Sequence, residues 1–175
     1  MSRSLGNLIA DSLELGLGYA ERLLVGVTAE NFAALANTGR TLIQSNHPAF
    51  IYGHLALYAP QIIAHLGGDV ARVQLPEGFE SLFSKDANCQ EDRDGKIYPA
   101  MDAVTTCFFD GYRAAVETLR AVDDEVLQQP NPSTGGMATM FPTVGSLLNF
   151  YAGGHLMTHL GQMSAWRRMS GLGAA

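Results

Sequence analysis

Two histidines near the end of the chain have the spacing of a metal site. His155 and His159 are four residues apart, so on a helix their imidazole rings point the same way, one turn apart. Both fall on the face that the surrounding apolar residues mark as the inner one. Neutral imidazoles so placed can share one divalent ion, each nitrogen about 2.0–2.1 Å away. A pair of hydrogen-bonded core histidines would explain the same spacing equally well.

A third histidine ligand is predicted from the depth at which it would lie in the fold. The segment 46–66 contains His47, His54 and His65. A metal site inside a helical bundle needs a donor near the middle of the facing helix, and His54 meets that condition best. His47 at the start of the helix and His65 near its end are predicted to be capping or surface residues. Three neutral histidines leave coordination positions open, where a water or thiol could be activated or a substrate polarised.

The type of ligand does not select one metal. Zinc, nickel, iron and cobalt all accept imidazole; zinc and nickel are expected first, with iron, cobalt and manganese as alternatives. The segment HLMTH lacks the glutamate of a zinc-protease HExxH motif, and no Glu-x-x-His pair indicates a di-iron site. No GxGxxG or Walker motif signals a nucleotide site. Asp110 is a weaker candidate for an extra ligand or base, since a solvated helix position explains it more simply.

Other polar and small residues surround the histidine pair. Gln162 follows His159 by three residues. It could hydrogen-bond to a metal-bound His159 without contacting the metal itself, or it could satisfy a buried backbone group. Gly153 and Gly154 precede His155, and each costs a helix interior about 1 kcal/mol relative to alanine. Close approach of a neighbouring helix explains the two glycines slightly better than close approach of a ligand.

Four segments with helical periodicity must position these residues. The first runs over about 5–27, the second over 48–66 with a kink near Pro60, the third from just after Pro99 to about 122, and the fourth over 143–170, with Thr143 as its N-cap. Apolar residues recur at three–four spacing in the first segment (Leu5, Leu8, Ser12, Leu15, Tyr19, Leu23, with Ile9, Leu13 and Gly16 beside them) and in the third (Met101, Val104, Phe108, Tyr112, Ala115, Leu119, Val122).

Two connections interrupt the helices. The stretch 69–99 is long and polar, with a helical turn expected within 77–83; a solvated crossover is the preferred interpretation, and a functional loop is the alternative. The linker 123–141 is rich in Pro, Gly, Ser and Asn. No convincing strand appears. We therefore predict an all-α fold, a four-helix bundle with a long crossover that forms one domain over residues 1–175.

Composition narrows the class of protein. The chain has 175 residues, 47% of them hydrophobic, with a formal net charge of −6, which is a globular composition without the basic footprint of a nucleic-acid binder. Cys89 and Cys107 form no CxxC pair or disulfide framework. Asp11 and Glu14 interrupt the apolar N-terminal stretch, so no signal peptide is predicted, and no run of about 18 apolar residues predicts a membrane span. A cytoplasmic protein with no membrane or nucleic-acid partner is expected.

Two segments resemble the DinB-like superfamily. FYAGGHLMTHLGQMSAWRRMSG is similar to that family's last helix, with its His-x3-His-x-Gly-Gln pattern, and NHPAFIYGHLALY is similar to its second helix, which supplies the first histidine in a Gly-His-Leu context. GVTAENFAAL and LPEGFESLFSKDA resemble the family's turn after the first helix and its crossover, so the likeness extends over nearly the whole chain. The resemblance implies a four-helix bundle with a metal held by His54, His155 and His159, and a homodimer.

The family resemblance also implies an activity. The family includes transferases and isomerases that depend on bacillithiol, mycothiol or related low-molecular-weight thiols, and many members of unknown activity. Some thiol-dependent relatives carry glutamate where this chain has His155. The leading hypothesis is a metal-dependent enzyme that acts on a small substrate through an activated thiol or water, as a thiol transferase, isomerase or hydrolase. A non-enzymatic metal-binding or stress-associated scaffold is one alternative, and three core histidines without metal are another.

Overall fold

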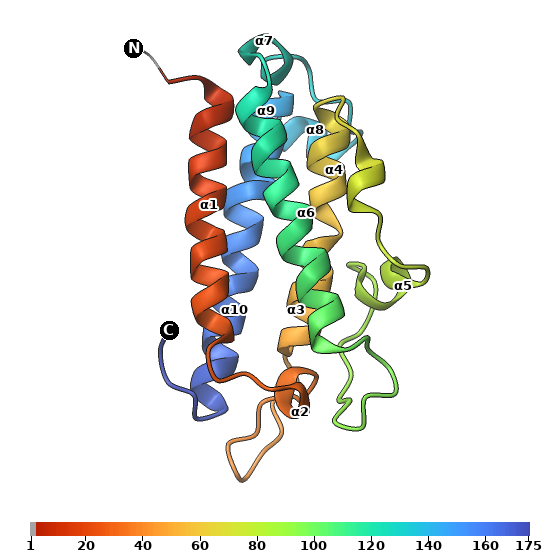
Figure 1. Ribbon diagram of the computed structural model, residues 1–175, viewed down its shortest axis with the longest axis vertical. Helices are drawn as coiled ribbons and strands as arrows, with labels where there is room; N and C mark the ends of the chain where they lie inside the picture. Colours follow the sequence, from red (N-terminus) through yellow and green to blue (C-terminus); the bar gives the residue numbers. More distant parts are fainter. Residues whose placement is uncertain (1–2) are drawn as a thin grey trace.

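The computed structural model describes residues 3–175 and is all-α, as predicted (Figure 1). Across these residues, β structure is limited to two isolated bridges, Asn37 with Leu42 and Pro130 with Thr143. The long elements are α1 (Leu5–Leu24), α3 (Pro48–Ala56), α4 (Tyr58–His65), α6 (Met101–Ala121), α9 (Val144–Asn149), η2 (Phe150–His155) and α10 (Leu156–Met169). The short ones are α2 (Ala29–Phe32), η1 (Val70–Val73), α5 (Phe79–Phe83), α7 (Asp124–Leu127) and α8 (Gly136–Met140).

The long elements form four segments packed side by side around one core. α6 contacts α1 on one side and the successive helices α3 and α4 on the other. α10 contacts both α1 and α3, so the four segments close on themselves as they do in a four-helix bundle (Figure 1). None of the described helices is both long and apolar enough to cross a lipid bilayer.

The second predicted helix is divided where the kink was expected. α3 ends at Ala56 and α4 begins at Tyr58, with Leu57 between them. Pro60 has no N–H to donate to the carbonyl four residues earlier, so the regular helical ladder cannot continue through this point. At the break, the amide of Leu57 donates a hydrogen bond to the carbonyl of His54, three residues earlier, at 3.2 Å. The break places Tyr58 beside the histidine that precedes it by one turn.

The fourth predicted helix is continuous but not uniform. The Thr143 side chain accepts a hydrogen bond from the amide of Ser146, which confirms the predicted N-cap. The helix then passes through one π-helical segment, η2, which ends at His155, before α10 continues. Single π turns occur often at functional sites. This one contains Gly153 and Gly154 and was not predicted.

The structure decides one question of packing and corrects one expectation. On α1 the buried face consists of Ile9, Leu13 and their neighbours, while Leu8 and Leu15, which also fall at three–four spacing, are exposed. The stretch 69–99 is not simply a solvated crossover, because Phe79, Phe83 and Tyr98 are buried in the core. The third segment follows its prediction, with its central stripe buried from Val104 to Leu119.

Candidate metal centre

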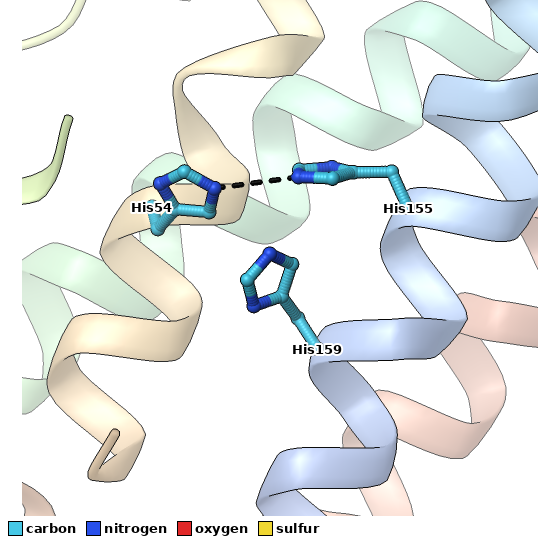
Figure 2. A group of neighbouring side chains, drawn as sticks. All are labelled: His54, His155 and His159. Carbon is cyan, nitrogen blue, oxygen red and sulfur yellow. Dashed lines mark hydrogen bonds between the residues drawn. The ribbon is translucent and has the colours of Figure 1, made fainter. Parts of the chain in front are cut away.

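The fold brings three histidines from two facing segments together (Figure 2). His54 comes from α3, His155 ends the π turn and His159 lies one turn further along α10. One ring nitrogen from each lies within 4.8 Å of the other two. Figure 2 shows the rings of His155 and His159 directed towards that of His54 across the gap between the helices. These are the three residues predicted as ligands, and the structure places them where one ion could contact all three.

The distance between two of the donor atoms fits a tetrahedral ion. The Nε2 atoms of His54 and His155 are 3.3 Å apart. Two donors that each lie 2.0–2.1 Å from a tetrahedral zinc ion are separated by about 3.3 Å. A hydrogen bond between the two nitrogens gives the same separation. The distance is therefore compatible with metal binding.

The ring of His54 is held in the tautomer that a metal ligand needs. Its Nδ1 lies 2.8 Å from the carbonyl oxygen of Phe83, to which it can only donate. The proton is thereby fixed on Nδ1, and the Nε2 lone pair points into the gap between the helices. A backbone carbonyl in this position is a common outer partner of metal-bound histidine.

Gln162 does the same for His159. Its side-chain oxygen lies 3.1 Å from Nδ1 of His159 and also accepts a hydrogen bond from the Asn46 side-chain amide at 3.0 Å. The second hydrogen bond fixes the orientation of the Gln162 amide, with its oxygen facing the imidazole. Nδ1 of His159 must then carry the proton, which leaves Nε2 free for a metal. Of the two roles considered for Gln162, the structure supports the hydrogen bond to His159.

His155 is oriented by packing rather than by a hydrogen bond to its outer nitrogen. Its Nδ1 is buried and has no hydrogen-bond partner within residues 3–175. The ring centroid of Tyr58 lies 4.2 Å from that of His155, and Phe150 and Tyr151 also flank the imidazole. A neutral ring between aromatic side chains has few orientations open to it.

Burial keeps all three imidazoles neutral. It lowers the pKa of His54 and of His159 below the usual 6.5, and the positive charge that His54 would carry lowers the pKa of His159 further. For His155, burial together with the neighbouring His159 and His54 lowers the pKa to about 3. Metal binding requires the unprotonated ring, so at neutral pH no proton has to leave before an ion binds.

The remaining candidates do not join the cluster. His47 is fully buried and caps α3: its Nδ1 accepts from the amide of Phe50, and its Nε2 lies 2.9 Å from the carbonyl of Gln90. Both ring nitrogens are therefore occupied, as the prediction of a capping role requires. His65 is at the end of α4, away from the other histidines. Asp110 is exposed on α6 and pairs with Arg113 at 3.3 Å, so its interpretation as a solvated residue holds.

Gly153 lies beside α1, and Gly154 lies beside a residue of its own turn. A Cβ atom built on Gly153 would lie 3.4 Å from the hydroxyl of Ser12 on α1. The corresponding atom on Gly154 would meet only the ring of Phe150, its neighbour in the same turn. Both distances are ordinary van der Waals contacts, so close approach of a neighbouring helix does not by itself require glycine at either position.

The cluster opens into two adjoining cavities. The smaller, of about 380 Å³, is lined by all three histidines together with Asn46, Phe50, Tyr58, Ser84, Lys85 and Ala87. The larger, of about 950 Å³, lies between α4, α5 and the π turn and shares Tyr58, Ser84, Lys85 and His155 with the first. Below we call them the metal pocket and the outer cleft. A small molecule in the outer cleft could therefore reach the histidines.

Sequence reasoning missed the contribution of the long crossover. Phe83, Ser84 and Lys85 all come from its segment around α5, and they supply a hydrogen-bond acceptor and part of the lining. Phe79 and Phe83 were the available signal, because two large apolar residues in a polar stretch need a core to enter. Comparison of the chain with protein-family models, with curated proteins and with solved structures gave no match.

Proposed function

We propose that this chain is a DinB-like protein in which His54, His155 and His159 hold one divalent metal ion, and that it is a metal-dependent enzyme acting on a small substrate. One observation carries the proposal: the ring nitrogens of the three histidines converge at the edge of a cavity that opens outward. Three protein ligands and an open position are the pattern of catalytic rather than structural zinc sites.

A bound divalent ion would supply a Lewis acid, lowering the pKa of whatever group occupies the open position. The chain's own residues would then bind and orient the substrate. The Tyr58 hydroxyl is well placed for this, since its side chain lines both cavities. Burial raises the pKa of Tyr58, so at neutral pH the phenol keeps its proton and can donate a hydrogen bond to a bound group.

A thiol needed for the reaction would have to come from outside the chain. Neither Cys89 nor Cys107 is among the residues that line the two cavities. Burial raises the pKa of Cys89 to about 11 and also raises that of Cys107, so both stay protonated at neutral pH. Since the thiolate is the reactive form, the chain's own cysteines are poor nucleophiles. A thiol-dependent transferase reaction at this site would therefore use a free low-molecular-weight thiol as co-substrate.

The test is a turnover assay with added thiol. Protein loaded with zinc or nickel is incubated with a test electrophile, such as 1-chloro-2,4-dinitrobenzene, and with bacillithiol, mycothiol or cysteine. We expect metal-dependent loss of the thiol, abolished in His159→Ala. Hydrolysable esters are tested in place of the electrophile as well. Equally fast conversion in His159→Ala, or no conversion of any of these substrates, would contradict the proposal that the protein is an enzyme. Either result would favour a metal-binding scaffold.

A further inference from the structure

The charge balance of the metal pocket indicates the class of ligand that it binds. Three neutral imidazoles cancel none of the charge of a divalent ion, so the ion would keep both positive charges. None of the residues that line the metal pocket carries a carboxylate. Its one ordinarily charged side chain is Lys85, which adds a further positive charge. Lys85 is exposed, so water screens part of this charge. An anion in the pocket would still be attracted by both the ion and the ammonium group.

Lys85 lies where the two cavities meet. It lines both the metal pocket and the outer cleft, whereas the acidic residues Glu80 and Asp86 line the outer cleft alone. Among the ion pairs within residues 3–175, none includes Lys85. The other lysine of the chain, Lys96, is paired with Asp94 at 3.0 Å. Lys85, which is exposed and lines both cavities, is thus available to a ligand.

The outer cleft supplies an apolar surface beside that charge. Leu57, Leu75, Phe79, Met137, Phe150 and Tyr151 all contribute to its lining. Its volume of about 950 Å³ is within the range of cavities that hold small organic molecules. A ligand that filled it and reached the histidines would place its apolar part on these side chains and its end beside Lys85.

From these observations we propose that the substrate is an amphipathic organic anion, with an aromatic or aliphatic body in the outer cleft and an acidic group directed at Lys85 and the metal pocket. The attraction of the anion by the metal ion rests on the proposed function. The attraction of the anion by Lys85 does not depend on metal. The carboxylates of Glu80 and Asp86 in the outer cleft would attract a cation there, but at the histidines a cation would face Lys85 and the ion.

The proposal is tested with matched probes. ω-Phenylalkanoates of two to five chain carbons and the corresponding neutral amides are titrated into zinc-loaded protein by isothermal titration calorimetry, beside His54→Ala. We expect at least one acid to bind about tenfold or more tightly than its amide, and the preference to weaken but persist in His54→Ala. An exposed charge pair contributes modestly, so Lys85→Gln should weaken acid binding about two- to fivefold, and Lys85→Glu more. Lys96→Gln is the matched control and should bind as the parent does.

Three results would overturn the proposal: equal affinity for acid and amide, no change in Lys85→Glu, or no binding of any probe. Elemental analysis of the same samples distinguishes failure of the anion proposal from failure of the proposed metal site. Zinc present without a preference for acids would refute the anion proposal alone. Zinc absent from the parent would refute the metal site, and the anion proposal would then be decided by whether Lys85→Glu still weakens binding of the acid.

Discussion

His54 and His155 are 101 residues apart in the chain, yet their Nε2 atoms lie 3.3 Å from each other. Both nitrogens face a gap that His159 also faces (Figure 2). Nδ1 of His54 is occupied by the carbonyl of Phe83, so its Nε2 has only a lone pair to offer. A ring with this arrangement can accept a hydrogen bond from Nε2–H of His155 or share one metal ion with it, and the following predictions distinguish the two.

The two histidines on the fourth segment should both be required for metal binding. His155→Ala and His159→Ala are each expected to lose most bound metal, because two imidazoles bind a divalent ion far more weakly than three. His65→Ala, outside the cluster, should bind metal as the parent does. His47→Ala should keep its metal but lose about 1 kcal/mol or more of unfolding free energy, because it removes a helix cap. Inductively coupled plasma mass spectrometry measures the metal content, and urea unfolding measures the free energy of unfolding. Metal loss in His47→Ala would mean that the ligand on α3 is misassigned.

Gln162 should set the metal affinity without binding the metal itself. Replacing Gln162 with leucine removes the acceptor for Nδ1 of His159, and loss of such an outer partner typically lowers metal affinity about 10–100-fold. Competition with a zinc chelator measures the change. Gln129→Leu, an exposed position in the linker, is the control. Equal affinity in both variants would show that Gln162 only packs against the ring.

Gly53 should be needed for the crossover to reach the site. A Cβ atom on Gly53 would overlap the ring of Phe83, so Gly53→Ala should displace α5 and destabilise the protein by about 1–3 kcal/mol. It should also weaken metal binding, since the carbonyl of Phe83 would leave His54. Gly161→Ala is the matched control: a Cβ there meets nothing within 4 Å, and alanine should raise helix stability by up to about 1 kcal/mol. Thermal melts with and without zinc compare the two, and unchanged stability in Gly53→Ala would mean that the crossover packs more loosely than described.

The metal-free protein should lose stability in mild acid. Burial lowers the pKa of all three histidines in the folded state, that of His155 to about 3, while in the unfolded chain they titrate near 6.5. Between these values the unfolded state binds more protons, so the free energy of unfolding falls as the pH is lowered from about 6.5 towards 3. Urea unfolding in EDTA at pH 7.5 and 5 measures the loss. We expect a smaller loss in His155→Leu; an equal one would assign the acid sensitivity to other groups.

The convergence of the three candidate ligands could be predicted because helix geometry determines it. A spacing of four residues brings His155 and His159 onto one face, and the depth of His54 in its helix matches theirs. The face of α1 could not be predicted, since leucines at three–four spacing occur on both of its sides and only packing decides between Leu13 and Leu15. The acceptor for His54 could not be predicted either, because the carbonyl of Phe83 is a backbone group and every residue carries one. The π turn before His155 has no marker beyond two glycines.

The most direct test of the three-histidine site is elemental analysis of protein purified without an affinity tag, beside His54→Ala and the control His65→Ala. We predict close to one divalent ion per chain in the parent and in His65→Ala, and almost none in His54→Ala. A parent without metal, even after reconstitution with zinc and with nickel, would contradict the site and leave three neutral histidines packed in the core of a helical bundle.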